Sequence, residues 1–152
     1  MKQSCLSIII AVGLTLPAFG QGVDPLIGSW KLNLEKSPSA ALRFKSLTLT
    51  WSGEGQNLID TVEGVDAQGR AFKVVLRHIY DGMPHQATGS QDYDSTTYTR
   101  IGNTINFVRF KQGKAVGVGQ IVMVPGKTVT ITTEDIDANN QPYHTVGVYD
   151  RQ

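Results

Sequence analysis

His78 and Tyr80 have the side chains best placed in the sequence to do chemistry inside a protein. Both are in phase with Phe72 and Leu76 in segment 72–80, where apolar residues recur at every second position. An imidazole and a phenol on an apolar face need polar partners, which can be neighbouring side chains, a buried water or a bound ligand. We therefore take Phe72, Leu76, His78 and Tyr80 as candidate ligand-binding residues. A purely structural role for the two polar groups is the alternative.

No motif for nucleophilic catalysis or metal binding accompanies these residues. The sequence has neither a Gly-x-Ser-x-Gly nor a Ser-x-x-Lys motif, and its one cysteine is Cys5. The histidines at 78, 85 and 144 form no His-x-His or His-x-x-x-His pair, the close spacings that metal sites favour. We expect no catalytic residue, no metal and no cofactor. An isomerase or cyclase acting through His78 and Tyr80 is the enzymatic alternative.

The charged residues indicate no charged partner. Lys and Arg number 14 against 13 Asp and Glu, which argues against a dedicated nucleic-acid binder. Basic residues near Phe107 and Phe110, Arg109 among them, are interpreted as belonging to a solvated strand. The carboxylates fall at expected strand ends and turns and are interpreted as solvated surface; they include Asp92, Asp94, Asp135 and Asp137.

The first 20 residues have the layout of a secretory signal peptide. A basic Lys2 precedes the apolar run 6–16, Pro17 ends that run, and Ala18-Phe19-Gly20 places small residues before a cut at Gln21. The run is shorter than the about 20 residues that a transmembrane helix needs. Cys5 precedes the run, whereas a lipoprotein cysteine would follow it. We therefore expect a periplasmic or secreted protein that is not a lipoprotein, with no membrane span after cleavage.

Residues 21–152 are expected to form a single all-β domain. Short stretches of period two, such as 27–34, 47–51 and 143–149, are separated by turn residues, among them Asp81-Gly82 and Pro125-Gly126-Lys127. The spacing between turns suits antiparallel hairpins and leaves no room for crossover helices. Only segment 35–44 could hold a helical turn or two. The pattern predicts an antiparallel up-and-down meander of about 8–10 strands, closed into a barrel because closure removes exposed edges. A two-sheet β-sandwich is the alternative.

Three stretches carry a resemblance to a known group of proteins. They are Gly28-Ser-Trp30 with its continuation to Ser37, the Thr-x-x-x-x-Asp-Ala-x-x-Gln-Pro stretch from Thr132 to Pro142, and Val146-Gly-Val-Tyr-Asp150. Together they resemble small exported bacterial lipocalin-like proteins, which are β-barrels of the calycin type. In that group a tryptophan of the first strand closes one end of the barrel, and a basic residue near the last strand packs across it. The resemblance implies this role for Gly28, Trp30 and Arg151, with Arg100 as the other candidate base.

The resemblance also implies a small, mainly apolar ligand in the barrel interior. The sequence departs from typical secreted lipocalins because the expected mature chain contains no cysteine and hence no disulfide. A packed barrel that acts as a non-catalytic structural or interaction module is the alternative function. The size of the interior space distinguishes the two hypotheses.

Overall fold

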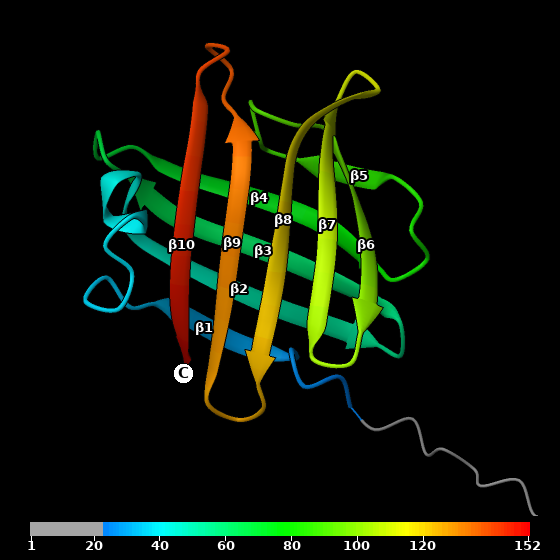
Figure 1. The fold of residues 1–152 in the computed structure, drawn as a ribbon. Helices are drawn as coiled ribbons and strands as arrows, with labels where there is room; N and C mark the ends of the chain where they lie inside the picture. The colour runs from blue at the N-terminus through cyan, green and yellow to red at the C-terminus, as the bar shows by residue number, and fades with distance from the viewer. Residues whose placement is uncertain (1–22) are drawn as a thin grey trace, which may run out of the picture.

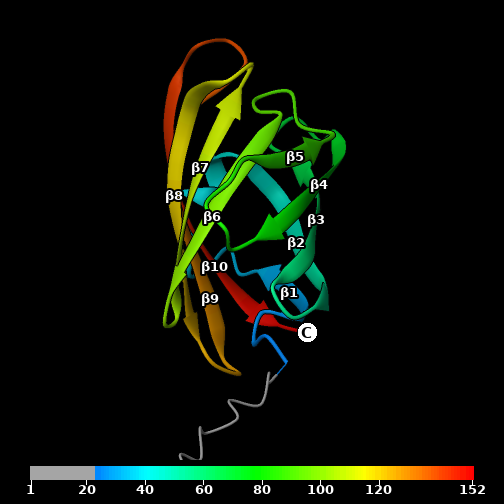
Figure 2. The same cartoon turned by 90° about the vertical axis from the view of Figure 1, so that its right-hand side faces the viewer.

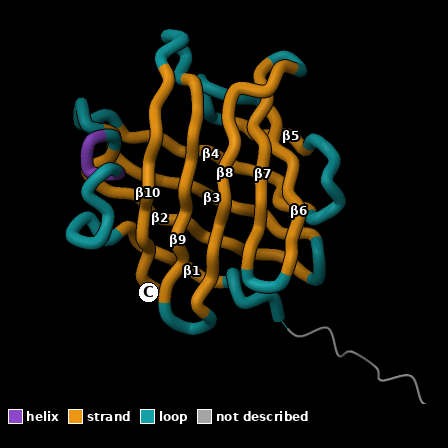
Figure 3. Tube along the Cα trace, in the orientation of Figure 1, coloured by secondary structure: helices purple, strands orange, loops and turns teal. Residues whose placement is uncertain are grey.

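The computed structural model describes residues 23–152, so the expected signal peptide at 1–20 lies outside the described residues. Figures 1 and 3 show that this part of the chain consists almost entirely of strands and short turns. The strands are β1 (Gly28–Leu32), β2 (Phe44–Glu54), β3 (Asn57–Asp66), β4 (Ala71–Ile79), β5 (His85–Thr88), β6 (Ser95–Ile101), β7 (Thr104–Lys111), β8 (Lys114–Val124), β9 (Thr128–Ile136) and β10 (Pro142–Arg151). One turn of 3-10 helix, η1 (Ala40–Leu42), lies in the segment for which the sequence allowed a helix.

The strands close into a barrel in which each strand pairs antiparallel with its neighbours in the chain. Closure occurs where β1 pairs with both β2 and β10, so that Trp30 lies opposite Leu49 on one side and Arg151 on the other. Figure 2 shows the barrel in profile, with β7–β10 on one side, β1–β4 on the other and β6 crossing between them. The expected closed up-and-down meander is confirmed, and the sandwich alternative does not apply.

Alternation along each strand sorts side chains between the interior and the surface. On β4, Val74, Leu76 and His78 are buried, whereas Lys73 and Arg77 are exposed. The β6–β7 connection turns through Gly102, whose positive φ of 59° is a conformation that glycine adopts without steric cost. Period two therefore predicted the inward face of β4 correctly.

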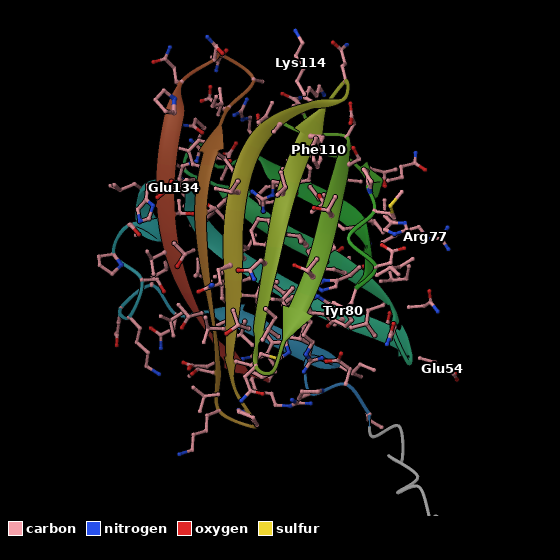
Figure 4. The ribbon with its side chains drawn as sticks, turned by 45° about the vertical axis from the view of Figure 1, so that its right-hand side comes forward. Glu54, Arg77, Tyr80, Phe110, Lys114 and Glu134 are labelled. Atoms are coloured by element: carbon pink, nitrogen blue, oxygen red, sulfur yellow. The ribbon has the colours of Figure 1, made fainter. Side chains whose placement is uncertain are left out.

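The packed core occupies one end of the barrel, which we call the Trp30 end. Trp30, Trp51, Leu58, Ile105 and Val129 are almost fully buried there. Figure 4 labels Glu54 on the hairpin at this end and Lys114 on the β7–β8 turn at the opposite end. The opposite end, which we call the loop end, is bordered by residues 40–44, 66–71, 89–92 and 137–139.

Residues 33–43 cover the gap between β10 and β2 above the short strand β1. Ser37 is fully buried, and its hydroxyl accepts a hydrogen bond from the Val148 amide at 2.6 Å. The hydroxyl of Ser39 accepts from the Val146 amide at 2.8 Å in the same way. Two serine side chains thus replace ladder hydrogen bonds that β1 is too short to provide. Among residues 23–152, no helix has the length and apolarity needed to cross a membrane.

Candidate ligand-binding cavity

A cavity of about 620 Å³ lies inside the barrel and reaches the loop end. The large side chains at the Trp30 end, such as Trp30 and Trp51, fill the barrel there, whereas those around the cavity line its wall and leave the centre open. The apolar part of its wall comes from Leu47, Leu49, Val62, Phe72, Val74, Leu76, Phe107, Ile121 and Ile131. The polar part comes from Asp60, Tyr93, Tyr98, Arg109, Thr133, Tyr143, Thr145 and Tyr149.

Arg109 and Asp135 form an ion pair beside the cavity. The Arg109 guanidinium donates to Oδ2 of Asp135, and the Tyr143 hydroxyl donates to the same oxygen at 3.1 Å. The guanidinium also lies over the Tyr93 ring, 4.6 Å from its centroid. Burial raises the pKa of Asp135, while the adjacent guanidinium lowers it. The earlier interpretation of both residues as solvated is wrong: Asp135 is 3% exposed and Arg109 lines the cavity.

Gly117 explains how this pair can form across three strands. Arg109 on β7 lies opposite Gly117 on β8, which in turn lies opposite Asp135 on β9. A Cβ atom on Gly117 would overlap the Asp135 carboxylate. Since β8 carries no side chain in this row, the guanidinium and the carboxylate can meet over it.

Asp60 is an acidic residue on the inward face of β3, between Trp51 of β2 and Leu76 of β4 in the register. It is 6% exposed, and its Oδ1 has no hydrogen-bond partner among residues 23–152. Burial raises the pKa of Asp60 to about 8, against the lowering effect of Arg109. At neutral pH this carboxyl is therefore mostly protonated. Asp60 is a lining residue that the sequence pattern did not predict, although it is in phase with Leu58 and Val62.

The four predicted ligand-binding residues divide between the cavity and the Trp30 end. Phe72 and Leu76 line the cavity, but His78 and Tyr80 are not among its lining residues. His78 is fully buried, accepts a hydrogen bond from Trp51 Nε1 at 3.2 Å and stacks on Tyr98 with ring centroids 3.8 Å apart. Burial, with a contribution from the charge of Arg100, lowers the pKa of His78 to about 3, so the imidazole is neutral.

Tyr80, labelled in Figure 4, fastens the N-terminal lead at the Trp30 end. Its hydroxyl donates to Asp24 at 3.0 Å, and Arg100 forms an ion pair with the same carboxylate at 2.6 Å. Burial raises the pKa of Tyr80, and the Asp24 carboxylate adds to this shift. Tyr80 thus has its polar partners at the Trp30 end, whereas His78 is bonded there through Nδ1 only and its buried Nε2 has no hydrogen-bond partner among residues 23–152.

Gly28, Trp30 and Arg151, for which the resemblance implies a role in barrel closure, lie together at the Trp30 end. The Arg151 guanidinium lies 5.0 Å from the Trp30 ring centroid and donates to the Ile27 carbonyl at 2.7 Å. Gly28 has a φ of 128°, and a Cβ there would come within 2.9 Å of that guanidinium. Arg100, the other candidate base, pairs with Asp24 instead.

Within residues 23–152, there is no group of three or more His, Cys, Asp or Glu side chains that could hold a metal ion. His85 contacts Asp81 at 2.9 Å, and His144 lies 4.0 Å from Glu134, each as an isolated pair.

The fold and the cavity together define a closed ten-stranded up-and-down β-barrel with an internal space open to one end. A solved structure similar to this fold is that of the fluorescent protein UnaG, with a TM-score of 0.54 and 15% sequence identity. The alignment covers 83% of this chain and 96% of UnaG. At this identity the likeness is one of fold.

Two further solved structures align over similar lengths. Rv2717c from M. tuberculosis has a TM-score of 0.49 at 16% identity, covering 84% of this chain and 93% of that one. The redesigned β-barrel mFAP1, bound to DFHBI, has a TM-score of 0.41 at 11% identity, covering 84% and 95%. No protein-family model and no curated protein matches the chain.

Proposed function

We propose that this chain is an exported lipocalin-like protein that binds a small ligand in the interior of its barrel. The observation that carries the proposal is the cavity of about 620 Å³, which falls within the about 300–1,000 Å³ typical of small-molecule sites. A barrel that served only as a structural module would gain stability by filling this space with apolar side chains, because its apolar wall residues would then leave water and gain packing contacts. The cavity therefore favours ligand binding over the structural module.

The wall suits a ligand with an apolar body and at least one polar group. Phe72, Leu76 and Phe107 offer apolar contact, whereas Asp60 and Tyr143 offer hydrogen bonds. His78 stacks on the lining residue Tyr98 and would hold this ring in place, rather than touch the ligand. Tyr80 would not touch the ligand either, because its hydroxyl is hydrogen-bonded to Asp24 at the Trp30 end.

Titration with Nile red, a neutral apolar dye, tests whether the interior accepts a ligand. We expect saturable binding at one dye per chain, with the blue-shifted emission of a dye that has left water. Val62→Phe, which places a larger side chain in the cavity, should weaken this binding at least about tenfold. Val122→Phe is the matched control, since Val122 lies on the outer face of β8 and is 37% exposed. Equal binding by both variants, or no saturable binding at all, would refute the proposal.

The export part of the proposal rests on residues 1–20 of the sequence. Expression of the full chain in a Gram-negative host, followed by fractionation and intact-mass measurement, tests it. The expected product is a periplasmic or secreted chain that begins at Gln21. A chain recovered only from the cytoplasm with residues 1–20 intact would overturn this part.

A further inference from the structure

We propose that the preferred ligand is a small organic monocation, a protonated amine or quaternary ammonium on an apolar body, whose positive charge pairs with Asp60. This inference rests on the ligand binding proposed above and names the chemical class of the ligand. Arg109 inside the barrel would by itself suggest an anionic ligand, so the proposed ligand has the opposite charge.

The interior carries one acidic group more than it can pair. Arg109 is bound to Asp135, and Asp135 also accepts a hydrogen bond from Tyr143. Asp60 has an unpartnered Oδ1 and forms no ion pair among residues 23–152. Ionised, these three side chains sum to one negative charge, which a single cationic group would balance. A carboxylate ligand would bring a negative charge that Arg109, already paired with Asp135, does not balance, and above the pKa of Asp60 it would be a second uncompensated one.

Arg109 is poorly available to an anion. Its guanidinium is already engaged by Asp135 and packs against the rings of Tyr93 and Phe107. Its Nε has no hydrogen-bond partner among residues 23–152, but an anion that reached this nitrogen would meet a guanidinium whose charge Asp135 already balances. Pairing with Asp135 thus weakens the attraction of Arg109 for an anion.

The surroundings of Asp60 suit an organic cation. Tyr98, Tyr149 and Phe107 line the same cavity, and π faces attract cations in sites that exclude water. After burial, the charge of Asp60 is the largest cause that raises the pKa of Tyr98 and of Tyr149. The Asp60 carboxylate therefore lies near both phenol rings. A cation beside Asp60 would therefore meet aromatic rings as well as the carboxylate.

The loop end adds no attraction for anions. Two arginines, Arg43 and Arg70, border it, against the three acids Asp66, Asp92 and Asp137. Arg70 pairs with Asp66 at 2.8 Å, and Arg43 lies over the Tyr143 ring at 3.6 Å. With Lys45, whose ammonium lies beside Gly69 of the same loop, the charges around the entrance balance, so it does not favour an anion.

Pairing Asp60 with a cation near neutral pH requires the carboxyl to ionise, and the cation must also leave water and lie near the charge of Arg109. Because the pKa of Asp60 in the free protein is about 8, keeping it ionised at pH 7 costs about tenfold in affinity. The cation recovers this through a charge pair in a desolvated site. Binding should accordingly release a proton below the pKa of Asp60.

Other groups that face Asp60 keep their charge state over this pH range. Burial is the largest cause that raises the pKa values of Tyr93, Tyr98 and Tyr149, and nearby acidic groups raise those of Tyr98 and Tyr149 further. All three phenols therefore stay protonated. Arg109 remains protonated beside Asp135. The adjoining strands β2 and β4 present Trp51, Leu76 and the neutral imidazole of His78. A pH-dependent affinity between about pH 6 and the Asp60 pKa of about 8 therefore reports on Asp60.

A matched set of three probes on one naphthalene body tests the inference by isothermal titration calorimetry. The probes are naphthylmethyl-trimethylammonium, whose charge is fixed, neutral naphthylmethanol and anionic naphthoate. We expect the ammonium to bind at least about tenfold more tightly than the alcohol at pH 8, and naphthoate to bind most weakly. The ammonium affinity should rise up to about tenfold per pH unit from pH 6 and level off above pH 8.

Asp60→Asn and the control Glu54→Gln assign the effect to one carboxyl. Asp60→Asn should abolish the pH dependence and lower the ammonium affinity at least about tenfold, while the alcohol affinity stays within about twofold. Glu54→Gln removes an exposed carboxylate from the opposite end and should change nothing. Proton release, measured in two buffers of different ionisation enthalpy, gives a readout on the unmodified protein.

The possible outcomes separate this inference from the proposed function. Tighter binding of naphthoate or of the alcohol than of the ammonium, or an ammonium affinity unchanged in Asp60→Asn, would overturn the monocation while leaving the cavity a binding site. Saturable Nile red binding with no ammonium binding would do the same. Absence of binding by Nile red and by all three naphthalene probes would overturn both proposals.

Discussion

The guanidinium of Arg151 lies over the indole of Trp30, 5.0 Å from the ring centroid, and joins the last strand to the first. The same guanidinium donates to the carbonyls of Ile27 and Pro25 at 2.7 and 3.3 Å. Gly28 leaves the space that this side chain occupies. The contact therefore covers the packed end of the barrel and fixes the N-terminal lead against the C-terminus.

Replacement of Arg151 by Gln is expected to destabilise the barrel by about 1–2 kcal/mol, because a cation–π contact and two charged hydrogen bonds are lost. Thermal unfolding followed by circular dichroism should show a midpoint lower by a few degrees, about 2–5 °C. Lys127→Gln, an exposed change on the β8–β9 turn, is the control. Equal midpoints for the two variants would show that the Arg151 contact contributes nothing.

Ser37→Ala is expected to weaken the closure between β10 and the segment that follows β1. The substitution leaves the amide of Val148 without its 2.6 Å acceptor in a fully buried place, which costs about 1–3 kcal/mol. Hydrogen exchange of the Val148 amide should accelerate more than that of Val129, which lies outside this contact. Ser52→Ala, an exposed serine of β2, serves as the control. Unchanged protection of Val148 would contradict the role given to Ser37.

Arg109→Met is expected to destabilise the protein by about 3–5 kcal/mol, since Asp135 is then left buried without a countercharge. Adding Asp135→Asn to this variant should recover part of the loss. A double-mutant cycle, measured by urea unfolding, quantifies the coupling. Strictly additive effects would show that the two side chains do not interact. Gly117→Ala should mimic the single variant, because its Cβ displaces the carboxylate.

Much of the fold followed from local patterns. Period two placed Phe72 and Leu76 on the inward face of β4, and turn residues such as Gly82 and Gly126 have the positive φ that the connections need. Closure also followed, since an open meander would expose two edges. Trp30 of the Gly-x-Trp motif lies beside Arg151 because closure of the barrel pairs the first strand with the last.

The polar part of the cavity did not follow, for two physical reasons. Asp60 could have been noticed as an acid in phase with Leu58 and Val62, but an acid on an apolar face is costly, and solvent is the usual alternative. The pairing of Arg109 with Asp135 depends on a row that includes Gly117, and registers across three strands cannot be read from period two. Period two also placed His78 on the inward face of β4, but it does not show whether an inward residue lines the cavity or lies in the packed Trp30 end.

The stability of the protein is expected to depend on pH through Asp60. Its pKa is about 8 in the folded protein against an ordinary value of 3.8, so folding favours the protonated form. The carboxyl imposes no penalty below about pH 4, and the folded state loses stability as pH rises from there to about 8, by up to about 1.4 kcal/mol per pH unit. Asp60→Asn, which imitates the protonated acid, removes this penalty. Urea unfolding of both proteins should therefore give a stability difference near zero at about pH 4, growing in favour of the variant up to about pH 8 and constant above it. Glu54→Gln should show no such trend, and a difference for Asp60→Asn that is independent of pH would mean that Asp60 is ionised in the folded barrel throughout.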